Sequence, residues 1–208
     1  MSRLVLITTA SLAALALAAC GEKPNDLATT TDTTATAPAD PAAAPATADA
    51  DAAIRKAQDF VNAAGQASLV EIRTSEMALE KSKNTGVKAF AQKMIDDHTA
   101  GTEKLKAAAS AAALAPPPET LDDFHMRRIN DLVETDGDED FDADYMSLQV
   151  DAHNDAIKLF EDYSKDSATI SQLKMFADET MPTLTAHKAE AEKVRDTVKA
   201  VSDKKNPS

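Results

Sequence analysis

The sequence contains a single cysteine, Cys20, among its 208 residues. One thiol cannot form an internal disulfide, and it cannot supply a metal site built from several thiolates. The nineteen residues before it carry one charge, then an apolar run and then small residues. That order is typical of a secretory signal peptide, and the apolar run is too short to be a stable membrane span. We therefore interpret residues 1–19 as a signal peptide.

Cys20 stands at the position where a bacterial lipoprotein is lipidated. The stretch Leu17-Ala18-Ala19-Cys20 resembles a lipobox; the alternative is ordinary cleavage after Ala19 beside an incidental cysteine. Lipidation would use up the only thiol, leave no cysteine nucleophile, and anchor the protein to a membrane through several acyl chains. Because Gly21 rather than aspartate follows, the resemblance to other lipoproteins favours the periplasmic face of the outer membrane.

Large apolar side chains are almost absent from residues 24–52, which are mainly Pro, Thr, Ala and Asp. Such a segment cannot bury enough surface to offset its loss of conformational entropy on folding. We expect a lipidated cysteine and disordered tether over residues 20–50 and a folded domain over residues 51–203. Residues 204–208 form a short tail. A domain of this length can build one hydrophobic core.

Basic residues are too few to balance the acidic ones. The chain has 22 Lys and Arg against 35 Asp and Glu, which gives a formal net charge of −13. A surface of this sign repels phosphate backbones, and no basic cluster relieves the repulsion. The composition therefore argues against nucleic-acid binding, and it names no protein partner.

The alternating pattern of β-strands is missing from the domain, whereas helical periodicity is strong. It predicts four long helices over about 51–83, 86–114, 139–164 and 168–202, and a short helix over about 119–134. The first two and the last two long helices are joined by short turns and should form antiparallel hairpins. The middle connection is long enough to run the length of the bundle. We predict an all-α fold, a ferritin-like four-helix bundle whose crossover carries the short helix.

Each predicted long helix has one ionisable residue on its apolar row. Reading the helices at 4-3 spacing gives Glu71, His98, His153 and His187. A polar group inside a bundle needs a partner, and facing helices supply one at least cost. Glu71 and His98 are equally far from the first turn, so they should lie at the same height. We therefore predict a Glu71–His98 hydrogen bond or ion pair.

In the second hairpin, counting residues from the turn does not place the two histidines at the same height. If its turn centres near Asp166, His153 and His187 are offset by about eight residues, or roughly 12 Å along a helix. Tyr145 and Asp142 would then lie nearer the level of His187 than His153 does.

These side chains allow three interpretations. The first is a structural buried polar network that requires no cofactor. The second is a transition-metal site, because imidazole and carboxylate suit Fe, Mn, Zn or Cu. The third is a pH-sensing role. The network would contain Glu71, His98, Asp142, Tyr145, His153 and His187, and the metal ligands would be Glu71, His98, His153 and His187. The Glu-x-x-His motif of di-iron bundles is missing, and its nearest match is Asp122-x-x-His125.

Motifs of covalent or phosphoryl-transfer catalysis are also missing. The sequence has no nucleophile elbow and no glycine-rich phosphate loop, so it predicts no catalytic residue. Our first hypothesis is therefore a non-enzymatic envelope lipoprotein that works through binding or stress protection. The alternative is a metal-binding or redox bundle that uses the inward Glu and His residues.

Several ordered motifs resemble one family of bacterial proteins. They are Val70-Glu71-Ile72, the run from Val87 to His98, Phe141-Asp142-x-x-Tyr145, His153, and Pro182-x-Leu184-x-x-His187. Over about residues 51–200 they resemble the domain-of-unknown-function 4142 family, whose members are ferritin-like and are often labelled as exported or outer-membrane proteins. The resemblance implies a four-helix bundle with a crossover and implies no activity. Family-typical residues matched here are Glu71, Asp97, His98, Asp142, Tyr145, His153, Pro182 and His187.

We expect Cys20→Ala to move the protein from the membrane fraction to the soluble fraction, because the variant loses its acyl anchor. Fractionation of cells followed by immunodetection measures the change. A variant that still sediments with outer membranes would show that lipidation is not what holds the protein there.

Overall fold

The computed structural model describes residues 43–135 and 138–205, which belong to one compact unit, Pro41–Ser208. The predicted signal peptide, the lipidation site Cys20 and most of the predicted tether lie outside these residues. Within the described part, none of the helices combines the length and the hydropathy needed to cross a membrane.

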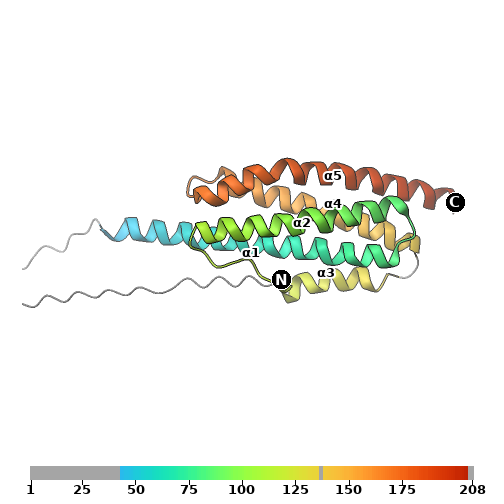
Figure 1. Cartoon of the computed structure of the whole chain (residues 1–208), viewed down its shortest axis with the longest axis horizontal. Coiled ribbons are helices and arrows are strands. Elements are labelled where there is room, and N and C mark those ends of the chain that lie inside the picture. Colours follow the sequence, from blue (N-terminus) through green and yellow to red (C-terminus); the bar gives the residue numbers. More distant parts are fainter. Residues whose placement is uncertain (1–42, 136–137, 206–208) are drawn as a thin grey trace, which may run out of the picture. The chain divides into compact units, whose positions relative to one another are not determined.

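The described chain forms five α-helices, drawn in Figure 1. They are α1 (Ala43–Lys81), α2 (Thr85–Ala111), α3 (Asp123–Val133), α4 (Asp138–Lys165) and α5 (Ser171–Lys205). No strand occurs in residues 43–135 or 138–205. The predicted all-α bundle is confirmed, and the predicted short helix is present as α3.

The long helices pack as two hairpins. α1 packs on α2 and α4 packs on α5, and the hairpins meet where α2 contacts α5 and α1 contacts α4. The connection from α2 to α4 carries α3, which lies against α1 and also contacts α4 (Figure 1). Every long helix therefore turns one face toward a shared centre, which is where the predicted ionisable residues were expected.

Local chemistry sets the ends of these helices. The Asn84 side chain accepts hydrogen bonds from the backbone N–H groups of Gly86 and Val87, at 2.9 and 3.3 Å, and so caps α2. Asp122 caps α3 by accepting from the His125 N–H. Beyond α2, Ala113 has a left-handed φ of 56°, as residues just past a helix often do.

Five predicted boundaries are wrong by three residues or more. α3 begins at Asp123, four residues after its predicted start, and α5 ends at Lys205, three residues after its predicted end. α1 begins at Ala43, so residues 43–50 of the predicted tether are helical. Their alanines favour helix, and a proline is tolerated in the first helical turn. α2 ends at Ala111, three residues before its predicted end, and α5 begins at Ser171, three residues after its predicted start.

The apolar core consists of two clusters along the bundle. The Phe60 cluster contains Phe60, Leu105, Phe160 and Leu173, and Phe60 stacks on Tyr163 with 4.1 Å between ring centroids. The Phe90 cluster contains Ala78, Phe90, Met94, Met146 and Val198. On each long helix one buried ionisable residue lies between the two clusters, and these four residues are Glu71, His98, His153 and His187. The bundle thus has a polar layer between two apolar ends.

Two helical glycines have opposite surroundings. A Cβ added at Gly65 would lie 2.7 Å from Pro117 and 2.8 Å from Pro118, so this glycine lets the proline run pack on α1. A Cβ added at Gly101 would meet nothing within 4 Å. Packing therefore requires glycine at position 65 and does not require it at position 101.

We expect Gly65→Ala to lower the free energy of unfolding by about 1–3 kcal/mol, because rigid proline rings must move. Gly101→Ala should raise it by about 0.5–1 kcal/mol, because alanine loses less backbone entropy in a helix. Urea unfolding of both variants measures the difference. Effects of the same sign would contradict the packing of residues 116–118 against α1.

Candidate metal site

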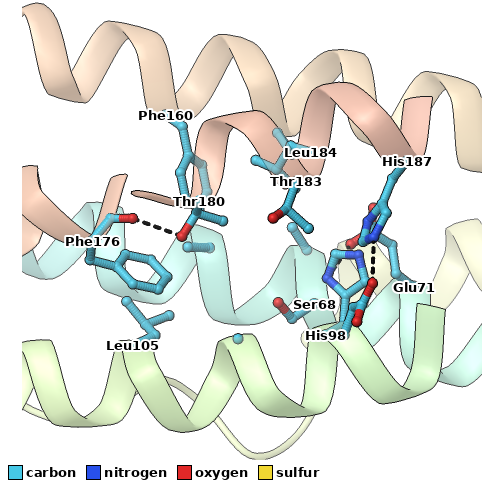
Figure 2. Close-up of a pocket in the computed structure, with 15 residues that line it drawn as sticks. Ser68, Glu71, His98, Leu105, Phe160, Phe176, Thr180, Thr183, Leu184 and His187 are labelled. Atoms are coloured by element: carbon cyan, nitrogen blue, oxygen red, sulfur yellow. Dashed lines mark hydrogen bonds and ion pairs between the residues drawn. The ribbon is translucent and has the colours of Figure 1, made fainter. Parts of the chain in front are cut away.

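Three histidines from three helices meet in the polar layer. His98 of α2, His153 of α4 and His187 of α5 each offer a ring nitrogen, and the three nitrogens lie within 4.8 Å of one another. Their ring centroids are 5.4–5.7 Å apart. All three side chains are buried, with exposed fractions of 7%, 0% and 1%. Figure 2 shows His98 and His187 side by side with Glu71 next to them.

The predicted offset between His153 and His187 is wrong, because their ring centroids are 5.4 Å apart. The turn between α4 and α5 spans residues 166–170 and is centred two residues later than the sequence analysis assumed. This shift halves the offset along the helices to about four residues, or roughly 6 Å. Side-chain reach covers the remainder.

Glu71 contacts two of the three histidines. Its Oε2 lies 3.0 Å from His98 Nδ1, and its Oε1 lies 3.3 Å from His153 Nδ1. The predicted Glu71–His98 contact is therefore present, and the glutamate side chain is only 1% exposed. Glu71 was also a predicted metal ligand, but its oxygens face the Nδ1 atoms of these rings, and it is not part of the three-nitrogen cluster.

One nitrogen of every clustered histidine is held by an acceptor. His153 Nδ1 donates to the backbone carbonyl of Gln149 at 2.8 Å. His187 Nε2 lies 2.8 Å from Asp97 Oδ2, which also accepts from Lys93 Nζ, and 3.0 Å from Lys93 Nζ itself. Because an ionised carboxylate can only accept, we assign the ring proton to His187 Nε2. Glu71 Oε2 lies 3.0 Å from His98 Nδ1, so each of the three rings has one nitrogen beside an oxygen atom. We call these the outer nitrogens.

The second nitrogen of each ring has no hydrogen-bond partner among the described residues. These inner nitrogens, all buried, are His98 Nε2, His153 Nε2 and His187 Nδ1. In a neutral imidazole whose outer nitrogen carries the proton, the inner nitrogen carries a lone pair. A buried acceptor without a partner is costly. Three of them on neighbouring rings form a donor set that suits a metal ion.

Burial sets the charge of these groups in the metal-free protein. It lowers the pKa of His98 to about 3 and the pKa of His153 to about 4, and it also lowers the pKa of His187. Burial raises the pKa of Glu71 to about 8. The imidazoles therefore remain neutral at physiological pH, as metal ligation requires.

The pKa of Asp97 is shifted in the opposite direction to that of Glu71. The hydrogen bond from Lys93 is the largest cause that lowers the pKa of Asp97, and the bond from His187 adds to it. Asp97 therefore stays ionised and accepts the His187 Nε2 proton. An anionic acceptor at the outer nitrogen raises the basicity of the inner one.

Other residues predicted for the polar network lie farther along it. Tyr145 shares a 2.8 Å hydrogen bond with Ser75, and Asp142 is buried within one turn of Tyr145 on α4. Gln149 donates from its side chain to Thr74 at 3.0 Å. The fourth histidine, His125, lies on α3, where it pairs with Asp122 and not with the cluster.

No site role was predicted for Lys93, Asp97 or Gln149. Asp97 precedes His98 and falls outside the apolar row of its helix, although it was among the family-typical residues. The Lys93–Asp97 pair has the i, i+4 spacing of helical ion pairs, which is a weak signal. The Gln149 group that holds His153 is a backbone carbonyl, so no residue pattern could indicate it.

Together, the fold and the site define an all-α bundle with a buried three-histidine cluster. Comparison with family models gives the particular family. Residues 41–194 match the model described as "Domain of unknown function (DUF4142)", and the chain belongs to this family. No curated protein and no solved structure matches the chain.

In the metal-free protein, we expect His98→Ala to lower the free energy of unfolding by about 2–4 kcal/mol, because Glu71 loses a buried partner and a small cavity forms. The double variant with Glu71→Ala should be less destabilised than the sum of the single variants. Urea unfolding in the presence of a chelator measures all three.

His125→Ala is the matched control. It should lower the free energy of unfolding by less than about 1 kcal/mol, because the ion pair of His125 with Asp122 lies near the surface. Additive effects of Glu71→Ala and His98→Ala would contradict a shared buried interaction.

Proposed function

We propose that the bundle binds one transition-metal ion through His98, His153 and His187. One observation carries the proposal: each ring has one nitrogen beside an oxygen atom and one buried nitrogen with no hydrogen-bond partner among the described residues, and the three residues offer ring nitrogens within 4.8 Å of one another. A purely structural network would be expected to satisfy these nitrogens with protein partners. A metal ion satisfies all three at once.

The donor set selects the class of metal. Three imidazole nitrogens suit Zn²⁺, Cu²⁺, Fe²⁺ or Ni²⁺ better than Mg²⁺ or Ca²⁺, which prefer oxygen. Histidine nitrogens bind zinc at about 2.0–2.1 Å, so two nitrogens on one tetrahedral ion are about 3.4 Å apart. The cluster nitrogens are at most 4.8 Å apart. Ring movements of about 1 Å would bring them to bonding distance.

The surrounding carboxyl groups complete the chemistry of the site. Glu71 lies behind His98 and His153, and Asp97 lies behind His187. Carboxylates at the outer nitrogens orient the rings and strengthen their binding to a metal. The positive ion would in turn offset the cost of burying an ionised Glu71, because opposite charges favour each other's charged form.

We also propose that this bundle works at the periplasmic face of the outer membrane as a lipid-anchored binding module. The support comes from the sequence around Cys20, which lies outside the described residues. A metal-holding module fits the first hypothesis of a binding protein, and redox chemistry at the same ion is the alternative. Neither requires a catalytic side chain beyond the metal ligands.

Zinc titration of the purified full chain carrying Cys20→Ala tests the proposal, because that change removes the only competing thiol. We expect one equivalent of Zn²⁺ to bind. His153→Ala should lower the affinity at least a hundredfold through loss of a ligand. Asp97→Asn should lower the affinity for zinc about 10–100-fold, because a neutral amide replaces the carboxylate beside the His187 outer nitrogen. Isothermal titration calorimetry measures both effects.

Two matched controls separate the site from nonspecific binding to an acidic surface. His125→Ala removes the histidine outside the cluster, and Asp96→Asn makes the same charge change one residue from Asp97 on an exposed side chain. Both should bind zinc as the parent does. A parent that binds less than about 0.1 equivalent, or variants that all bind alike, would contradict a three-histidine site.

A further inference from the structure

A small cavity lies directly beside the histidine cluster. Its volume is about 40 Å³, and it lies between the four long helices and extends toward the Phe60 cluster (Figure 2). Glu71, Asp97, His98 and His187 line one part of it, and Ser68, Thr180 and Thr183 add hydroxyl groups farther along. The other lining residues are mainly apolar, among them Leu105, Phe160 and Leu184.

Two of the three candidate ligands border this cavity. His98 and His187 line it and have unpartnered inner nitrogens, whereas His153 does not line it. A metal ion held by three protein nitrogens keeps a further coordination position for an exogenous ligand. An ion held by this cluster would therefore have the cavity next to His98 and His187.

The volume of the cavity limits what can enter. One water molecule needs about 10–15 Å³ of this kind of volume. The cavity therefore holds a ligand of two or three non-hydrogen atoms. Among the described residues that line it none is Lys or Arg, whereas Glu71 and Asp97 are acidic, so the lining disfavours a multiply charged anion.

Two residues that line the cavity also reach the surface. Gly101 of α2 is partly exposed, and a Cβ there would meet no atom within 4 Å. Thr183 of α5 is exposed. A glycine inside a helix costs about 0.5–1 kcal/mol relative to alanine, and packing does not require it at position 101. We therefore place the entrance of the cavity at these two residues.

We infer that this cavity is a binding chamber for a small neutral or monoanionic ligand that donates a lone pair to the open position of the metal. The inference rests on the proposed function. The ligand enters past Gly101 and Thr183 and occupies the space bordered by His98 and His187. The three histidines hold the ion, and the chamber selects the ligand by size and charge.

Azide is a suitable probe, because it is a monoanion of three atoms. The full chain carrying Cys20→Ala is loaded with Co²⁺, whose visible absorption reports its ligands, and is titrated with azide. We expect one bound cobalt and a saturable change in the absorption spectrum. Gly101→Leu should weaken azide binding at least tenfold and change cobalt affinity less than twofold, since its side chain fills the entrance without touching the ligands.

Ala100→Leu is the matched control: it adds a leucine one residue away on an exposed position and should leave azide binding unchanged. Thr183→Phe is a second entrance variant and should act like Gly101→Leu. Cobalt binding without any response to azide would overturn the chamber and leave the metal site standing. Equal azide binding by the parent and both entrance variants would also overturn it. Failure to bind cobalt would overturn both proposals.

Discussion

The centre of the bundle depends on the contact that Glu71 makes with two imidazoles. A carboxyl group buried to this degree needs partners, and it lies beside His98 of α2 and His153 of α4, although its Oε1 accepts no hydrogen bond from the described residues. The contact therefore ties three helices at one height. A shift in the register of any of these helices would move its buried polar group toward the Phe60 cluster or the Phe90 cluster. The apolar clusters supply cohesion, and the polar layer between them fixes the register of the helices.

The same layer supplies the chemistry. The outer nitrogen of each histidine lies beside an oxygen atom, which belongs to a buried carboxyl group, a backbone carbonyl or a partly exposed carboxylate. The inner nitrogen has no hydrogen-bond partner among the described residues. Burial keeps the rings neutral, so their lone pairs are available. The Phe60 cluster does not close completely on the layer, and the small cavity beside His98 and His187 is the result.

Much of the fold was predictable because it follows from periodicity. Apolar spacing predicted the long helices, and equal distances from a short turn predicted the contact between Glu71 and His98. The meeting of His153 with His187 was not predicted, because a two-residue error in a turn centre doubles into a four-residue error in register. The helical start at Ala43 was missed because alanine-rich sequence suits both a tether and a helix. Asp97, the Gln149 carbonyl and the cavity depend on side-chain direction, backbone and empty space, none of which a residue pattern displays.

The proposed function requires three imidazoles to hold one ion inside the bundle. X-ray absorption spectroscopy of the zinc-loaded full chain carrying Cys20→Ala is a direct test, because imidazole rings give a characteristic multiple-scattering signal. We expect three imidazole nitrogens at about 2.0–2.1 Å and one further light atom around the zinc. A shell made mainly of oxygen, with one imidazole or none, would place the zinc on the acidic surface and contradict the claim.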